Sequence, residues 1–272
     1  MLDRFIEAKK EELERLRLQE ANGTLPAPLE IDRPSLKRQL QEAPSVAVVA
    51  EYKRASPSKG IINPRLGAKE AAEAYAAGGA AAISVLTEKA HFHGSLAFLE
   101  RAQVAGLPLL RKDFLFHPLQ IAESAATPAA AVLLIVRYFL ETPGTLKTLV
   151  EQAQAYGLET VVEVFSEAEI DLARQAGADI IQVNNRDLDT LQVDLDRSYA
   201  LGKRKQAGEV WISASGVNAP QHCVALGERG FDAVLVGTWL MQHKEPAAAL
   251  RYLRGVGPGM AAAKSTPFFE QG

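Results

Sequence analysis

Lysine and glutamate side chains stand near the ends of several separate apolar runs in this chain. Glu51 and Lys53 follow the first run. Lys112 follows the third run, and Glu163 lies near the end of the fifth. A lysine beside another cation loses basicity and can act as a general acid near neutral pH, while a nearby glutamate can accept protons. These residues indicate proton-transfer chemistry if the fold brings them together.

Each of these charged residues could instead be a solvated strand end or half of a stabilising ion pair. Burying four charges in one place is costly unless they pair or bind a charged ligand. The group therefore points to a functional site more strongly than any one member does.

Two glycine-containing turns, Ser215-Gly216 and Gly237-Thr238, follow the last two apolar runs. Backbone N–H groups in such turns, together with the start of a following short helix, can bind phosphate. A single glycine is weak evidence because glycine ends many loops for conformational reasons. Two such turns on adjacent strands predict a phosphorylated substrate.

Eight short apolar runs alternate with alanine-rich amphipathic segments from residue 46 onward. Continuous apolar runs of this kind are typical of parallel strands that are buried on both faces. The runs cover 46–50, 81–86, 108–110, 130–136, 160–164, 179–183, 210–213 and 233–236. They begin about 27 residues apart on average, which fits one strand, one helix and two loops. The pattern predicts an α/β fold, a closed (β/α)8 TIM barrel, with an open doubly wound sheet as the alternative.

The predicted barrel also decides where the chemistry takes place. The loops after the strands of such a barrel meet at one mouth, which is where its active sites lie. The charged residues and both glycine turns are all expected at this mouth.

The chain divides into three predicted parts. Residues 1–45 form a helical extension, with an amphipathic helix over 3–20 and a second short helix that Ser35 caps. Residues 46–255 form the catalytic barrel. The glycine- and proline-containing tail, 256–272, has no apolar periodicity and is expected to be disordered.

Composition excludes several classes of function. The 272 residues carry 30 Lys and Arg against 33 Asp and Glu, so there is no excess of basic residues to favour nucleic-acid binding. The longest apolar run, 129–136, is far shorter than a membrane helix, and no signal peptide opens the chain. We expect a cytoplasmic globular protein with no membrane and no nucleic-acid partner.

Metal and nucleotide cofactors are also not indicated. A lone cysteine, Cys223, cannot form an internal disulfide or a multi-thiolate site. The five histidines lack metal-ligand spacing, and neither a dinucleotide-binding nor a phosphate-loop glycine motif is present. We therefore expect no metal site and no cofactor.

Seven motifs in this chain resemble, in the same order, the motifs of a known family. The motifs are Glu51-Tyr-Lys-Arg-Ala-Ser-Pro-Ser-Lys-Gly60, Ser84-Val-Leu-Thr-Glu88, Leu110-Arg-Lys-Asp-Phe114, Val162-Glu-Val164, Asn184-Asn-Arg-Asp-Leu188, Ser215-Gly216 and Leu235-Val-Gly237 followed by Leu240-Met241. Over residues 46–253 the chain resembles indole-3-glycerol phosphate synthase of tryptophan biosynthesis. The helical extension resembles that of the family as well.

The resemblance implies a ring closure without a cofactor. The substrate would be 1-(2-carboxyphenylamino)-1-deoxyribulose 5-phosphate, and the products indole-3-glycerol phosphate, carbon dioxide and water. It implies that Lys112 is the general acid that protonates the ribulose carbonyl as the aromatic carbon attacks. It also implies that Lys53 and Glu163 are the acid/base pair of the dehydration.

The resemblance implies roles for the remaining motif residues too. Glu51 would orient Lys53, and Asn184 would bind the sugar hydroxyls. The loop over 54–64 could close over the substrate and exclude water. The implied substrate contacts are Ser56, Pro57, Phe92, Arg186 and Leu188, and the implied phosphate contacts are Ser215, Gly216, Gly237 and Thr238, with Ser215 also counted among the catalytic residues.

Two other functions remain open. Phosphoribosylanthranilate isomerase shares the phosphate site, but that family relies on an early cysteine, and this chain has none before Cys223. A non-catalytic or impaired paralogue could keep the ligand site alone. Sequence does not give the oligomeric state, for which we expect a monomer or a weak homodimer.

Four positions depart from the family pattern. Ala214 stands where a glutamate is usual after the seventh strand. The absence of that carboxylate makes the net charge of the mouth more positive by one. Phe165 replaces the usual histidine, Gln182 a glycine, and Trp239 a small residue.

Restoring the missing carboxylate should make the enzyme faster. Ala214→Glu returns a negative charge beside the lysines, so we expect a higher kcat in an assay of product formation. An unchanged or lower kcat would contradict this account of the missing charge.

Overall fold

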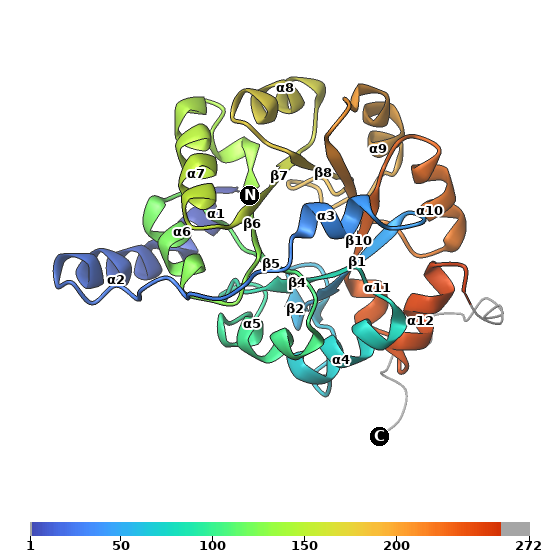
Figure 1. The fold of residues 1–272 in the computed structure, drawn as a ribbon, viewed down its shortest axis with the longest axis horizontal. Coiled ribbons are helices and arrows are strands. Elements are labelled where there is room, and N and C mark those ends of the chain that lie inside the picture. Colours follow the sequence, from blue (N-terminus) through green and yellow to red (C-terminus); the bar gives the residue numbers. More distant parts are fainter. Residues whose placement is uncertain (1, 257–272) are drawn as a thin grey trace.

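Eight parallel strands close into a barrel in the computed structural model, which describes residues 2–256 (Figure 1). In spatial order they run β1-β10-β9-β8-β7-β6-β5-β4, and β4 returns to β1. The strands are β1 (Ala47–Tyr52), β4 (Ala82–Leu86), β5 (Leu109–Lys112), β6 (Ala131–Ile135), β7 (Glu159–Val164), β8 (Ile180–Asn184), β9 (Val210–Ala214) and β10 (Ala233–Val236).

Pairing between the first and last strands confirms the predicted barrel. Ala47 of β1 pairs with Ala233 of β10, while Val49 of the same strand pairs with Ala82 of β4. An open sheet would leave two edges unpaired, so that alternative is wrong. The predicted runs end too early at some strands, because Glu51 and Lys112 lie within β1 and β5 rather than after them.

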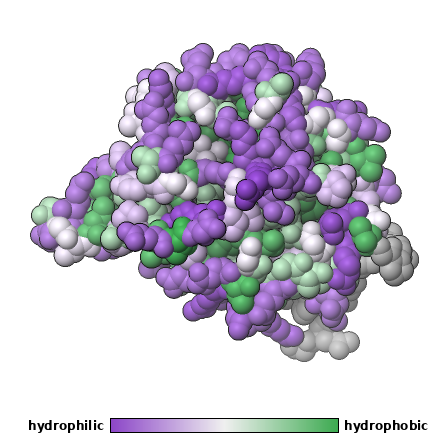
Figure 2. Space-filling view, in the orientation of Figure 1, coloured by the Kyte–Doolittle hydropathy of each residue, from purple (hydrophilic) through white to green (hydrophobic). Residues whose placement is uncertain are grey.

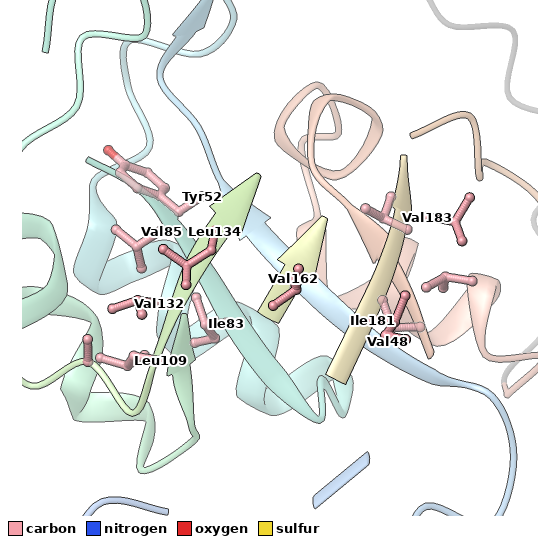
Figure 3. Packing of buried hydrophobic residues seen from close by; sticks show 14 of the residues in the cluster. Val48, Tyr52, Ile83, Val85, Leu109, Val132, Leu134, Val162, Ile181 and Val183 are labelled. Carbon is pink, nitrogen blue, oxygen red and sulfur yellow. The ribbon is translucent and has the colours of Figure 1, made fainter. Parts of the chain in front are cut away.

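Helices form the outer layer of the barrel (Figure 1). Their inner faces pack on outward-facing strand residues such as Val48, Ile83 and Val162, shown in Figure 3. Charged side chains cover the opposite faces, and the surface over α8 is largely hydrophilic in Figure 2. These helices are α4 (Ala68–Gly78), α5 (Ala97–Ala102), α6 (Pro118–Ala125), α7 (Pro143–Ala155), α8 (Glu167–Gln175), α9 (Asp196–Leu201), α10 (Pro220–Gly227), α11 (Thr238–Met241) and α12 (Pro246–Leu253), with 3-10 turns at Gln103–Ala105, Val136–Tyr138 and Gly202–Arg204.

Inward-facing residues of alternate strands fill the barrel in layers, as is usual for this architecture. The strand register places Val49, Leu110, Val161 and Ile212 in one apolar layer. Two residues further along the same four strands comes a layer made of Glu51, Lys112, Glu163 and Ala214. The fold thus sets three charged side chains on top of an apolar interior.

Three helices precede the barrel: α1 (Leu2–Ala8), α2 (Lys10–Ala21) and α3 (Leu36–Gln41). The predicted cap of the third is confirmed, since Ser35 Oγ accepts the backbone N–H of Arg38 at 3.1 Å. Leu36 and Leu40 join the same interior cluster as Ala47 and Ala233 at the strand starts, so α3 closes the amino-terminal end of the barrel.

A small hairpin follows β1, formed by β2 (Ala55–Ser56) and β3 (Gly60–Ile61). None of the helices described between residues 2 and 256 is both long and apolar enough to cross a membrane. The expected disordered tail, apart from Val256, lies outside the described residues.

The single helix expected over 3–20 is wrong, because a turn at Lys9 separates α1 from α2. Lys9 is buried, and its Nζ lies 2.6 Å from Asp113 Oδ1 and 2.7 Å from Glu12 Oε2. Arg111, fully buried, adds contacts to Asp113 at 3.4 Å and to Glu123 at 3.0 Å. Burial by itself would raise the pKa of Asp113, but the Lys9 and Arg111 cations outweigh it and hold that pKa below its usual value.

Removing the Lys9 ammonium should destabilise the protein strongly. Lys9→Met keeps the length of the side chain but leaves the buried Asp113 carboxylate with less compensation. We expect the free energy of unfolding to fall by about 3–5 kcal/mol in denaturant titrations. Lys10→Met, at the exposed next position, is the matched control and should leave the midpoint unchanged. Equal stability of the Lys9→Met protein and the wild type would show that this ion pair does not hold the helices.

Candidate functional site

A cavity of about 350 Å³ opens at the carboxyl ends of the strands. Every site residue predicted from sequence lies on its wall, although those residues come from seven of the eight strands and the loops after them. They are Glu51, Lys53, Ser56, Pro57, Phe92, Lys112, Glu163, Asn184, Arg186, Leu188, Ser215, Gly216, Gly237 and Thr238. The fold therefore brings the whole predicted set to one mouth.

Two lysine–glutamate pairs stand on the floor of this cavity. Lys53 Nζ lies 2.7 Å from Glu51 Oε2, and Lys112 Nζ lies 3.8 Å from Glu163 Oε2. Both carboxylates are buried, whereas each lysine side chain keeps about one sixth of its surface exposed. The lysines are thus accessible from the cavity, and the carboxylates balance their charge from below.

Glu163 is held by two amides on the neighbouring strand β8. Asn184 Nδ2 donates to Glu163 Oε1 at 3.1 Å, and Gln182 Nε2 donates to Oε2 at 2.5 Å. Asn184 Oδ1 in turn accepts the hydroxyl of Ser215 and the backbone N–H of Arg186, each at 3.0 Å. These bonds connect the floor of the cavity to the loops that surround it.

Arg186 brings a further cation to the cavity wall. Its guanidinium donates to the carbonyl of Leu191 at 2.8 Å. Burial lowers the pKa of Arg186, and the Glu51 carboxylate opposes that shift. An arginine stays charged in proteins, so this group can receive an anionic part of a ligand.

The two predicted phosphate turns have unusual backbone conformations. Ser215 and Gly216 both have positive φ, 73° and 91°, and a Cβ on Gly216 would lie 2.8 Å from Val193. Gly237 lies between β10 and α11, and a Cβ there would lie 2.0 Å from Glu51 Oε2. Glycine at 237 therefore makes space for the carboxylate that pairs with Lys53. The turn also leads into a helix start, where backbone N–H groups lack helical acceptors.

Aromatic rings form the opposite wall of the cavity. Phe114 stacks on Phe5 with ring centres 4.0 Å apart, and Phe92 lies 6.1 Å from Phe114. Sequence reasoning missed Phe5, which lies on α1, because nothing in the local pattern shows that this helix reaches the mouth. Glu88 orients the loop that carries Phe92, since its carboxylate accepts the backbone N–H groups of residues 90, 91 and 92 at 2.7–3.0 Å.

The four departures from the family pattern lie in different places. Ala214 and Trp239 line the cavity, and Trp239 stacks against Tyr252. Gln182 is fully buried beneath the floor of the cavity. Phe165 does not line the cavity, because its ring lies under the guanidinium of Arg137, 4.0 Å from the ring centre.

The described residues form neither a metal site nor a reactive thiol site outside the cavity. Within residues 2–256, no group of three or more His, Cys, Asp or Glu side chains is arranged to hold a metal ion. Burial raises the pKa of the Cys223 thiol to about 11, so it stays protonated at neutral pH.

Sequence comparison relates the chain to one family over almost its whole length. A model of the family described as indole-3-glycerol phosphate synthase matches residues 2–253. A relative of that name from Carboxydothermus hydrogenoformans is 41% identical over 210 residues, covering 76% of this chain and 79% of the relative. Indole-3-glycerol phosphate synthase 2 from Streptomyces coelicolor is 44% identical over 213 residues, covering 78% of this chain and 82% of the relative.

Comparison with solved structures independently supports the barrel. A thiamine phosphate pyrophosphorylase from Pyrococcus furiosus superimposes with a TM-score of 0.59 at 17% identity, covering 81% of this chain and 96% of that one. A 3-hexulose-6-phosphate synthase gives 0.59 at 18% identity, covering 78% and 100%. At such identities the likeness concerns the fold alone.

A methyl group at position 237 should disturb the cavity floor. Gly237→Ala places a Cβ against the Glu51 carboxylate, so we expect the free energy of unfolding to fall by about 1–3 kcal/mol. Gly144→Ala is the matched control, because a Cβ there meets nothing within 4 Å, and it should stabilise α7 by up to about 1 kcal/mol. Chemical denaturation measures both. Equal effects of the two substitutions would contradict the close approach at Gly237.

Proposed function

The chain belongs to the indole-3-glycerol phosphate synthase family, and from that premise we propose how its cavity residues perform the ring closure. The substrate is 1-(2-carboxyphenylamino)-1-deoxyribulose 5-phosphate, and the products are indole-3-glycerol phosphate, carbon dioxide and water. One observation carries the proposal. Two lysine–glutamate pairs stand on the floor of the same cavity that the two glycine turns border.

The substrate spans the cavity from the glycine turns to the aromatic wall. Its phosphate binds at Ser215-Gly216 and Gly237-Thr238, where backbone N–H groups and a helix start favour an anion. Its anthranilate ring lies against Phe92, with Pro57 and Leu188 on the same wall. Its carboxylate faces Arg186 and Ser56.

Ring closure begins with a proton from Lys112. The aromatic carbon that carries the carboxylate attacks the ribulose carbonyl carbon, and Lys112 gives a proton to the carbonyl oxygen as the new carbon–carbon bond forms. Carbon dioxide then leaves, and the electron pair of the broken bond restores the aromatic ring. Because the carboxylate departs as neutral carbon dioxide, Lys112 takes back one proton from solvent in each turnover.

Dehydration uses the second lysine. Glu163 removes a proton from the methylene carbon next to the new alcohol, while Lys53 protonates the departing hydroxyl group. Water leaves and the indole double bond forms. Glu51 orients Lys53 through their 2.7 Å contact, and Asn184 binds the sugar hydroxyls next to Glu163.

The wider setting of the enzyme follows from this chemistry. The small sugar phosphate is its only proposed partner, with no cofactor, no membrane and no nucleic acid. We place the protein in the cytoplasm as a monomer or a weak homodimer, with residues 1–45 as an extension of a single catalytic barrel. The hairpin after β1, which carries Ser56 and Pro57 into the cavity wall, closes over bound substrate.

A non-catalytic or impaired paralogue is the second candidate, and Ala214 favours it. The position lies in the charged layer and contributes only a methyl group. Both lysine–glutamate pairs are nevertheless complete, and a protein that only binds the substrate would not need them.

Lys112→Ala tests the assignment most simply. We expect kcat to fall by about 10²- to 10⁴-fold in a fluorescence assay of indole-3-glycerol phosphate, with no added metal or nucleotide. Lys69→Ala, on the exposed face of α4, is the control and should turn over like the wild type. If the wild type binds the substrate tightly in calorimetry but does not turn it over, the protein is the non-catalytic paralogue.

A further inference from the structure

Gln182 lies at the centre of β8, fully buried inside the barrel. It pairs with Glu163 of β7 on one side and with Ile212 of β9 on the other. The register places its side chain directly below the layer that contains Glu51, Lys112 and Glu163. A long polar side chain at this depth is unexpected, because the layer around it also contains Leu133 and Leu235.

We propose that Gln182 is a positioning residue, whose amide fixes the orientation of the Glu163 carboxylate for proton transfer. The inference rests on the role proposed for Glu163 in dehydration. Gln182 itself does not line the cavity and does not touch the substrate.

The two oxygens of Glu163 are held from opposite sides. Gln182 donates to Oε2 from below at 2.5 Å, while Asn184 donates to Oε1 from the cavity wall at 3.1 Å. Lys112 approaches the same Oε2 at 3.8 Å. Because both amides come from one strand, two residues apart, the plane of the carboxylate is fixed relative to β8.

The carbonyl end of the same amide shows that this bond determines how Gln182 lies. Gln182 Oε1 is buried and has no hydrogen-bond partner among the residues described. A buried acceptor without a partner costs about 1–3 kcal/mol. Turning the amide around would place Oε1 against the Glu163 carboxylate, so that two acceptors would face each other. The orientation therefore serves Glu163, although it leaves the carbonyl unsatisfied.

The small side chain of Ala214 makes the hydrogen bond from Gln182 to Glu163 more important. It pairs with Asn184 and completes the charged layer on the β9 side, where it contributes only a methyl group. No long side chain from β9 limits the movement of Glu163, so its orientation depends on the amides of Gln182 and Asn184 on β8.

Gln182→Met tests the proposal, because methionine has a similar length and no N–H donor. We expect kcat to fall by about 10- to 100-fold, since reacting groups that move by about 1 Å lose rate of this order. KM should stay within about twofold of the wild-type value, because the substrate contacts are unchanged. The melting temperature should change little, because relief of the unsatisfied carbonyl offsets the lost bond to the buried Glu163 carboxylate.

Ser84→Ala is the matched control. Ser84 lies at the same level of the barrel on β4, and its buried hydroxyl is also without a partner, but it has no contact with Glu163. We expect wild-type kcat from this variant. An equal loss in both variants would show that the interior packing matters rather than the bond to Glu163.

Gln182→Glu supplies a second readout that packing alone would not change. The introduced carboxyl can donate to Glu163 only while it is protonated, and the charged groups of the layer above it are Glu163, Lys112 and Glu51. We expect kcat relative to wild type to recover as the pH falls from 8.5 to 6.0, whereas the Gln182→Met ratio stays constant.

Two results would overturn the inference: wild-type kcat in Gln182→Met, or a Gln182→Glu ratio that does not change with pH. Failure of the proposed function would look different. In that case the wild type itself would not turn over, or Glu163→Gln would keep full activity. The pH profile also keeps the inference testable if Gln182→Met does not fold.

Discussion

Opposite charges on top of an apolar barrel interior are the constraint on which this structure depends. Glu51, Lys112 and Glu163 form a layer two residues further along their strands than the apolar Val49, Leu110 and Val161, at a depth where an unpaired charge would be very costly. Each carboxylate is therefore next to a lysine, and the lysines stay partly exposed to the cavity. The same arrangement that makes these charges tolerable leaves two ammonium groups available to a substrate.

Closure of the barrel fixes the positions of the side chains that pair in this charged layer. The four strands of the charged layer are spread over residues 47–214, yet their register fixes which side chains share that layer. Glycine at 237 then leaves space for Glu51, and the amides of β8 hold Glu163. The N-terminal helices join the site through Lys9, which pairs with Asp113 immediately after Lys112. Stability and chemistry thus share the turn after β5.

Much of this was accessible from sequence, because continuous apolar runs report parallel strands and the chemistry of a barrel gathers at one end. The strands and the cavity wall follow from that rule. The break at Lys9, the place of Phe5 and the bond from Gln182 to Glu163 do not follow from it. Each depends on contacts between segments that no local pattern relates, and Phe5 lies 109 residues before its stacking partner Phe114. In the sequence Gln182 is only a departure from the family pattern, and the strand register is what places it next to Glu163.

The most direct measurement is a crystal structure of the Lys112→Ala protein with its substrate bound. The account predicts the phosphate at the turns formed by Ser215-Gly216 and Gly237-Thr238, the aromatic ring beside Phe92, and the ribulose carbonyl facing the space that the lysine has left. A phosphate bound at Arg186, with the aromatic ring at the glycine turns, would reverse the substrate and contradict the assignment of every group in the cavity.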